Sequence, residues 1–340
     1  MNDASPQGTG VSEVPGTAGG DGSATVLVTG AGGCLGAWTL RHLLDLGHRP
    51  VAFDLSPHRA RIEALLDADE LASVTFVQGD IGDKDQVVAA VTEHQVERIV
   101  HLAALQVPLC RANPSLGARV NVQGTVNVFE AARAAGIGHL AYASSIAVYG
   151  TASDYPAGIV GDEAPKLPRT LYGVTKIANE GTARVYWADH AISSVALRPY
   201  TVYGVGRDQG VTSEPSVAML AAARGQSSTI SFGGRMQFHW ASDVARQFID
   251  AAFGLVAPLA GGSGARVFDL GGPLVSVAEV AAIIERLRPG VSVAVGDARL
   301  PFPEGFDDAP LRAAAHTVYE TPLEEGIRLT IEAFEALEKA

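Results

Sequence analysis

The stretch LYGVTK places a tyrosine and a lysine four residues apart, at Tyr172 and Lys176, and these two side chains could transfer a proton. Residues at positions i and i+4 lie on one face of a helix, so both can point into one site. A free tyrosine has a pKa of about 10, and a nearby ammonium stabilises the phenolate, which would make Tyr172 a base tuned by Lys176. The alternative is an ordinary pair on a helix surface.

A base of this kind needs a partner that holds the reacting oxygen, and the stretch YASSIAVYG supplies a hydroxyl at the end of an expected strand. Ser145 is predicted to have this role. Its neighbour Ser144 lies on the opposite face of the pleat and is predicted to be structural.

A glycine-rich turn, VLVTGAGGCLG, follows the first expected strand and opens the first expected helix. Gly30 permits the tight turn, Gly33 lets the backbone approach a pyrophosphate, and Gly36 lets helix pack on strand. The spacing predicts a dinucleotide site, with an ordinary strand-to-helix turn as the alternative. Cys34 and Leu35 are expected to lie against the cofactor, Cys34 as a small packed residue rather than a reactive thiol.

Two aspartates end the next two expected strands. Asp54 stands where a carboxylate should bond the adenosine ribose hydroxyls and repel a 2′-phosphate, so NAD is expected rather than NADP. Its alternative is a capping or turn residue. Asp80 could bond the adenine amine or cap a helix, and Ile81 is expected beside it in the same site.

Apolar strands alternate with helical segments over residues 23–203, which predicts an α/β fold with a doubly wound (Rossmann) parallel sheet that binds NAD. The remainder, 204–340, is predicted to form mainly a smaller C-terminal substrate lobe, with sheet and helix elements returning around 235–272. Residues 1–22 are expected to be a disordered tail. Helices are expected near 34–46, 59–68, 84–93, 116–135, 172–190, 215–224 and 242–253.

The net charge of -12 argues against nucleic acid or an anionic membrane as a partner. No apolar run reaches the roughly 18 to 20 residues that a membrane span needs. Two cysteines cannot build a disulfide framework, and no spacing indicates a metal site. Without a signal peptide in the first 22 residues, a soluble cytoplasmic protein is expected.

Together these motifs resemble the extended short-chain dehydrogenase/reductase family, in its branch of NAD-dependent epimerases and dehydratases similar to UDP-glucose 4-epimerase. The resemblance rests on the glycine turn, HLAA at 101–104, NVQGT from 121, SSIAVYG to 150, Tyr-x-x-x-Lys and LRPYTVYG from 197. It implies that Ser145 is catalytic. It also implies a cofactor-lining role for Leu102, Ala103, Ala104, Asn121 and Pro199.

The sequence departs from the family pattern at the substrate site. Ile146 and Ala147 stand where dehydratases have an Asp-Glu pair, so dehydration is not expected. Thr201 replaces a common Asn of sugar-nucleotide epimerases, and Arg235 is displaced by one position, so a smaller substrate is favoured. The expected substrate contacts are Gln106, Ser145, Ile146, Thr201, Arg207 and Arg235, the two arginines either binding an anionic group or forming salt bridges.

The predicted function is therefore that of an NAD-dependent sugar or nucleotide-sugar epimerase acting by transient oxidation of a secondary alcohol. The alternative is an NAD-dependent dehydrogenase of a free sugar, a sugar acid or another secondary alcohol. A non-catalytic NAD sensor is a third reading, although such a protein would be expected to lose Tyr172 and Lys176. The resemblance also implies a homodimer formed through the helices near 116–135 and after Tyr172.

Overall fold

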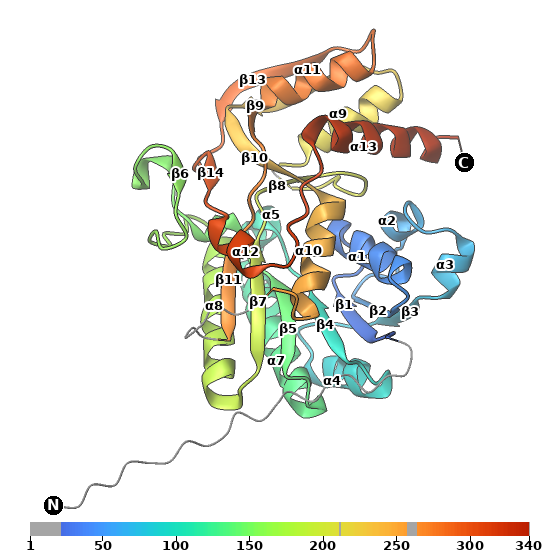
Figure 1. Ribbon diagram of the computed structural model, residues 1–340, viewed down its shortest axis with the longest axis vertical. Helices are drawn as coiled ribbons and strands as arrows, with labels where there is room; N and C mark the ends of the chain where they lie inside the picture. The colour runs from blue at the N-terminus through green and yellow to red at the C-terminus, as the bar shows by residue number, and fades with distance from the viewer. Residues whose placement is uncertain (1–21, 211, 257–263, 340) are drawn as a thin grey trace, which may run out of the picture.

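A parallel sheet of seven strands forms the centre of the computed structural model, which describes residues 22–210, 212–256 and 264–339. The strand order is β11-β7-β5-β4-β1-β2-β3 (Figure 1). This is the doubly wound α/β fold that was predicted. The strands are β1 (Thr25–Thr29), β2 (Arg49–Asp54), β3 (Thr75–Gln78), β4 (Arg98–His101), β5 (His139–Ala143), β7 (Ser193–Arg198) and β11 (Ala265–Asp269).

Helices cover both faces of this sheet because successive residues of a buried strand point to opposite sides. Val26 and Val28 of β1 belong to the core on the side of α1 (Cys34–Asp45) and α10 (Ala241–Ala252). Leu27 belongs to the core on the other side, with α4, α7 and α8. The bounds of these three helices are Lys84–Glu93, Gly124–Ala135 and Leu171–His190.

Two predicted helices are interrupted. The one expected near 59–68 is replaced by α2 (Ala60–Glu63) and α3 (Ala68–Ala72), because Asp67 caps α3 in a capping box with Glu70. The one expected near 116–135 consists of α6 (Pro114–Ala118), a π-helical turn (Arg119–Gln123) and α7. Short helices also occur in α5 (Val107–Ala112) and in the 3-10 turns Ile146–Val148 and Ala152–Asp154.

A smaller lobe with its own core lies over the carboxyl edge of the sheet (Figure 1). It contains three small sheets, β12-β10-β8, β13-β9 and β14-β6. Since β6 comes early in the chain and β11 returns to the main sheet, the chain crosses between lobe and sheet more than once; the division at residue 203 remains a prediction. The elements are β6 (Ile159–Val160), β8 (Thr201–Tyr203), α9 (Glu214–Ala223), β9 (Ser228–Gly233), β10 (Arg235–Trp240), β12 (Leu274–Ser276), α11 (Val277–Leu287), β13 (Val293–Arg299), β14 (Gly305–Phe306), α12 (Ala309–Ala314) and α13 (Leu323–Leu337).

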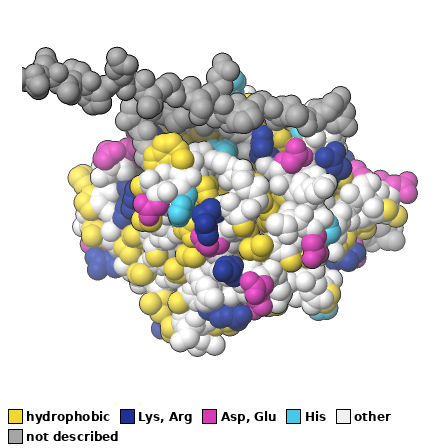
Figure 2. All heavy atoms as spheres, turned by 90° about the horizontal axis from the view of Figure 1, so that it is seen from below, with side chains coloured by type: hydrophobic (Ala, Val, Ile, Leu, Met, Phe, Trp, Pro, Cys, Tyr) yellow, Lys and Arg dark blue, Asp and Glu magenta, His cyan; other side chains and the backbone are white. Residues whose placement is uncertain are grey.

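The described surface carries charges of both signs. On the face seen from below, basic and acidic side chains are interspersed rather than gathered by sign (Figure 2). Among the helices of the described residues, none combines the length and the apolar character that crossing a membrane requires.

Candidate active site

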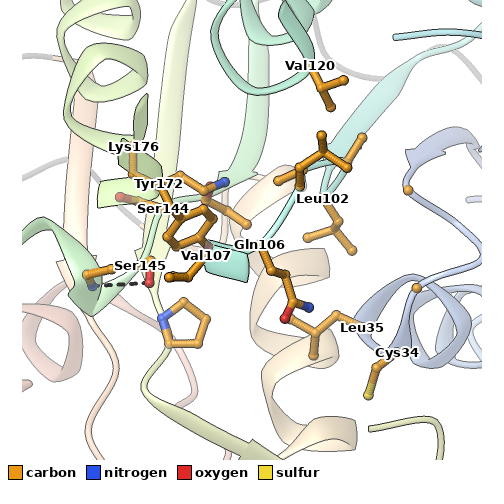
Figure 3. Close-up of a pocket in the computed structure, with 18 of the residues that line it drawn as sticks. Cys34, Leu35, Leu102, Gln106, Val107, Val120, Ser144, Ser145, Tyr172 and Lys176 are labelled. Atoms are coloured by element: carbon orange, nitrogen blue, oxygen red, sulfur yellow. Dashed lines mark hydrogen bonds between the residues drawn. The ribbon is translucent and has the colours of Figure 1, made fainter. Parts of the chain in front are cut away.

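A cavity of about 560 Å³ lies at the carboxyl ends of the central strands, where doubly wound sheets bind their ligands. Figure 3 shows Ser145, Tyr172 and Lys176 on one side of it and Cys34 and Leu35 on the other, with Gln106 between them. The predicted residues that line it are Gly30, Gly33, Cys34, Leu35, Gly36, Asp54, Asp80, Ile81, Leu102, Ala103, Ala104, Gln106, Ser145, Ile146, Tyr172, Lys176, Pro199 and Arg207.

The glycine turn needs its glycines for measurable reasons. Gly30 has φ +70°, and a Cβ built on it would lie 2.7 Å from the backbone of Ala103. A Cβ on Gly36 would overlap the backbone of Gly30 and Ala31. Helix α1 begins after Gly33 without a side-chain cap, so its first N–H groups are available to an anion. This cradle fits a dinucleotide diphosphate.

The carboxylates of the two aspartates accept hydrogen bonds from backbone N–H groups of nearby loops, and both residues line the cavity. Asp54 accepts hydrogen bonds from the backbone N–H groups of Gly32 at 2.9 Å and Ser56 at 3.0 Å. Asp80 accepts one from Gly82 at 2.8 Å and pairs with Arg119 at 2.5 Å. Both aspartates are therefore turn-capping residues that also line the cavity, and their contacts with the cofactor remain a prediction.

Cys34 is a packed residue, as expected. Its thiol donates to the carbonyl oxygen of Val205 at 3.5 Å, and burial raises its pKa to about 12. At neutral pH it is a thiol rather than a nucleophilic thiolate.

Tyr172 and Lys176 lie on the first two turns of α8, which Thr170 caps by accepting from the N–H of Gly173 at 3.0 Å. The Lys176 ammonium lies 5.5 Å from the Tyr172 ring centre, and burial lowers its pKa to about 8. Burial raises the pKa of Tyr172, whereas a hydrogen bond with Ser145 and the charge of Arg207 lower it. Arg207 is thus a cation that acts on the phenol, while Lys176 lies close to the ring.

The two adjacent serines have different surroundings. Ser144 is buried and donates to Glu180 at 2.6 Å. Ser145 lines the cavity and accepts from the N–H of Ala147 at 3.2 Å (Figure 3). Both serines line the cavity, but the hydroxyl of Ser144 is bonded to Glu180, whereas that of Ser145 is presented next to Tyr172.

Three predicted site residues do not line the cavity. Asn121 is buried in the π-helical turn, where it exchanges two hydrogen bonds with the backbone of Leu105, at 2.7 and 3.0 Å. It therefore shapes the cavity wall without facing the cofactor site. Thr201 is fully buried because alternation along β8 turns it away from the cavity. Arg235 is exposed on β10 and donates to the carbonyl oxygen of Leu274.

Other lining residues were not predicted. Tyr200 and Val202 line the cavity on either side of Thr201, and strand alternation could have identified them. Thr212 and Phe302 come from loops of the lobe and carry no local sequence signal.

Residues 26–253 match the model of the NAD dependent epimerase/dehydratase family. A UDP-glucose 4-epimerase of Mycolicibacterium smegmatis is 37% identical over 203 residues, which are 57% of this chain and 63% of that protein. The match thus spans less than two thirds of that relative's length.

Two solved structures are similar over almost their whole length. MoeE5 in complex with UDP-glucuronic acid and NAD is 29% identical, with a TM-score of 0.73 over 92% of this chain and 99% of that one. A partial consensus L-threonine 3-dehydrogenase has a TM-score of 0.80 over the same shares, and at 22% identity it shows the fold alone.

Proposed function

Because this chain belongs to the NAD-dependent epimerase/dehydratase family, we propose that it binds NAD and acts as an epimerase on a sugar or nucleotide sugar by transient oxidation of a secondary alcohol. One observation carries the proposal. Ser145, Tyr172 and Lys176 converge in the same cavity as the glycine turn that fits a diphosphate.

The residues that would hold NAD lie along one side of the cavity. The turn from Gly30 to Gly36 and the uncapped start of α1 suit its diphosphate. Asp54 and Asp80 suit the hydroxyl and amino groups of its adenosine. When bound, NAD would accept the hydride that leaves the substrate alcohol.

Tyr172 would take the proton of the substrate hydroxyl at its phenolic oxygen, and Ser145 would hold the substrate oxygen by a hydrogen bond. Since burial raises the pKa of Tyr172, the base needs the opposing effects of Ser145 and nearby positive charge. Ile146 and Ala147 are buried and apolar beside the site. They cannot move protons, which is consistent with epimerisation or oxidation rather than dehydration.

A net dehydrogenase of a smaller substrate is the second candidate, and the placement of Arg235 favours it. This arginine was a candidate to bind an anionic group of the substrate, yet it lies outside the cavity. If the oxidised product leaves before hydride returns, NADH accumulates.

The test measures NADH absorbance and product composition with nucleotide sugars, free sugars and sugar acids. The variant Tyr172→Phe should lower turnover at least about 100-fold while the Kd for NAD stays within threefold. Tyr186→Phe is the matched control, because Tyr186 lies on the same helix but donates to Glu130 outside the cavity. Turnover that survives Tyr172→Phe, or NAD binding without turnover of any alcohol, would contradict the proposal and favour the sensor.

The predicted homodimer is also a proposal, and exposed apolar side chains support it. Leu109 and Leu116 on α5 and α6, and Leu171, Val174 and Val185 on α8, are each between 39% and 56% exposed. Light scattering at micromolar concentration tests it, and a monomer there would refute it. Two unpaired cysteines, Cys34 and Cys110, support the cytoplasm as the proposed compartment.

A further inference from the structure

Arg207 is a charged side chain in the cavity that lacks an ion-pair partner among the described residues. Its Nη2 donates to Thr212 at 3.1 Å, and its Nε is buried with no partner. Burial lowers its pKa, which reflects the cost of removing a guanidinium from water. Arg207 is half-buried, and a cation with a buried, unbonded Nε is normally compensated by an anion, so the arrangement points to a ligand that supplies one.

The adjacent carboxylate does not fill this role. Asp208 is 56% exposed and pairs with Arg61 at 2.7 Å. Arg61 also donates to the carbonyl oxygen of Gly32 at 3.0 Å. The loop that carries Arg207 is thereby tied to the glycine turn. Asp208 acts on Arg207 through its charge but forms its ion pair with Arg61.

Arg207 lines the cavity within reach of both of its sides. Its charge lowers the pKa of Tyr172 on one side and opposes the rise in the pKa of Cys34 on the other. A Cβ built on Gly210 would lie 3.2 Å from Nη2 of Arg207 and would also overlap the side-chain oxygen of Gln106, so these two side chains border one small space.

The charges that line the cavity divide between its two ends. The aspartates that line it, Asp54 and Asp80, follow β2 and β3 at the glycine-turn end. Around Tyr172 the lining charges are those of Lys176 and Arg207, both cations. An electropositive end of this kind favours an anionic substrate.

Resting on the proposed function, we propose that Arg207 binds the carboxylate of the substrate, which is a hydroxylated acid of the sugar-acid class. A guanidinium matches a carboxylate by two parallel hydrogen bonds. Since the charge of Arg207 reaches Tyr172, a carboxylate on Arg207 and an alcohol at Tyr172 would fit one small molecule. Gln106 and Thr212 border the space that the carboxylate would enter.

Calorimetry on the NAD-loaded protein tests this with D-gluconate and D-glucuronate against neutral D-glucose. We expect at least one acid to bind tenfold or more tightly than glucose. Arg207→Met should abolish that preference, and Arg207→Lys should restore part of it. Arg235→Met is the matched control and should leave the preference unchanged, because Arg235 lies outside the cavity. Failure of both acids to bind, or a preference that survives Arg207→Met, overturns the assignment.

Two further binding measurements test whether Arg207 binds a diphosphate, of NAD or of a nucleotide sugar, instead of a carboxylate. The Kd for NAD should change less than threefold in Arg207→Met; a tenfold increase would assign the guanidinium to the cofactor diphosphate and overturn the proposal. The Kd for UDP-glucose should be the same in Arg207→Met and in the unmodified protein. Tenfold weaker binding of UDP-glucose to Arg207→Met would assign the residue to a nucleotide-sugar diphosphate and would also overturn it.

The same measurements in a Tyr172→Phe background separate this inference from the proposed function. Arg207-dependent acid binding with no turnover of any alcohol in the otherwise unmodified protein would contradict the redox function but uphold the carboxylate site. Turnover of neutral sugars that is insensitive to Arg207→Met would do the reverse. Circular dichroism and Tm of each variant verify that it is folded.

Discussion

The ammonium of Lys176 donates a hydrogen bond to the backbone oxygen of Ala143, the last residue of β5, at 2.7 Å. The lysine is therefore fixed between a strand end and α8, with its charge 5.5 Å from the ring centre of Tyr172. A side chain that is 3% exposed and bonded in this way retains its position without a ligand. The site is preorganised on the side of the proposed base.

Lys176→Met should lower turnover at least about 100-fold, because it removes a positive charge next to the phenolate that forms when Tyr172 gives up its proton. Steady-state kinetics of the purified variant measure the effect. Lys166→Met is the matched control, since Lys166 also donates to backbone oxygens and lies 4.5 Å from the ring centre of Tyr149, outside the cavity. Equal losses in both variants would show that Lys176 acts only through the fold.

Local spacing was sufficient for the features that a single turn or helix fixes. The glycine turn and the Tyr172–Lys176 pair depend on residues near one another in sequence, and the structure brings both into one cavity. The direction in which a side chain points was harder to predict. The resemblance gave the position of Thr201 but not the face of β8 on which its side chain lies. Phe302 reaches the cavity only through the packing of the lobe, which short-range patterns do not encode.

Gly30→Ala should abolish NAD binding. The φ of +70° costs an alanine about 1–2 kcal/mol, and its Cβ would also meet the backbone of Ala103 at 2.7 Å. Gly136→Ala is the control, because Gly136 has φ +72° with no atom within 4 Å of the added Cβ. Calorimetric titration with NAD should separate them: binding in Gly30→Ala at the unmodified Kd would contradict the tight approach.

Stability should fall as the pH is lowered below neutrality. Burial lowers the pKa of His101 to about 3 and those of His42 and His239 to about 4, from an ordinary value of 6.5. Below that value the unfolded chain binds protons that the folded chain does not, so the free energy of unfolding decreases by up to about 1.4 kcal/mol per pH unit for each histidine. Urea unfolding at pH 7.5 and 5.5 measures this loss.

The variant His101→Gln isolates one of these residues, whose ring bonds Thr29 at 2.7 Å and Thr125 at 3.0 Å. The free energy of unfolding of this variant should change less with pH than that of the unmodified protein, by up to about 1.4 kcal/mol per pH unit. An identical pH dependence in the variant and the unmodified protein would mean that His101 is not held neutral.

Arg198→Met should destabilise the fold by about 3–5 kcal/mol, since it leaves buried carboxylates without a counter-charge. Arg198 pairs with Glu180 at 2.8 Å and Asp269 at 3.4 Å, and each of the three side chains is at most 5% exposed. The exposed pair of Arg224 and Glu338 provides the control, for which Arg224→Met should cost less than about 1 kcal/mol. Urea unfolding of the two variants compares them directly.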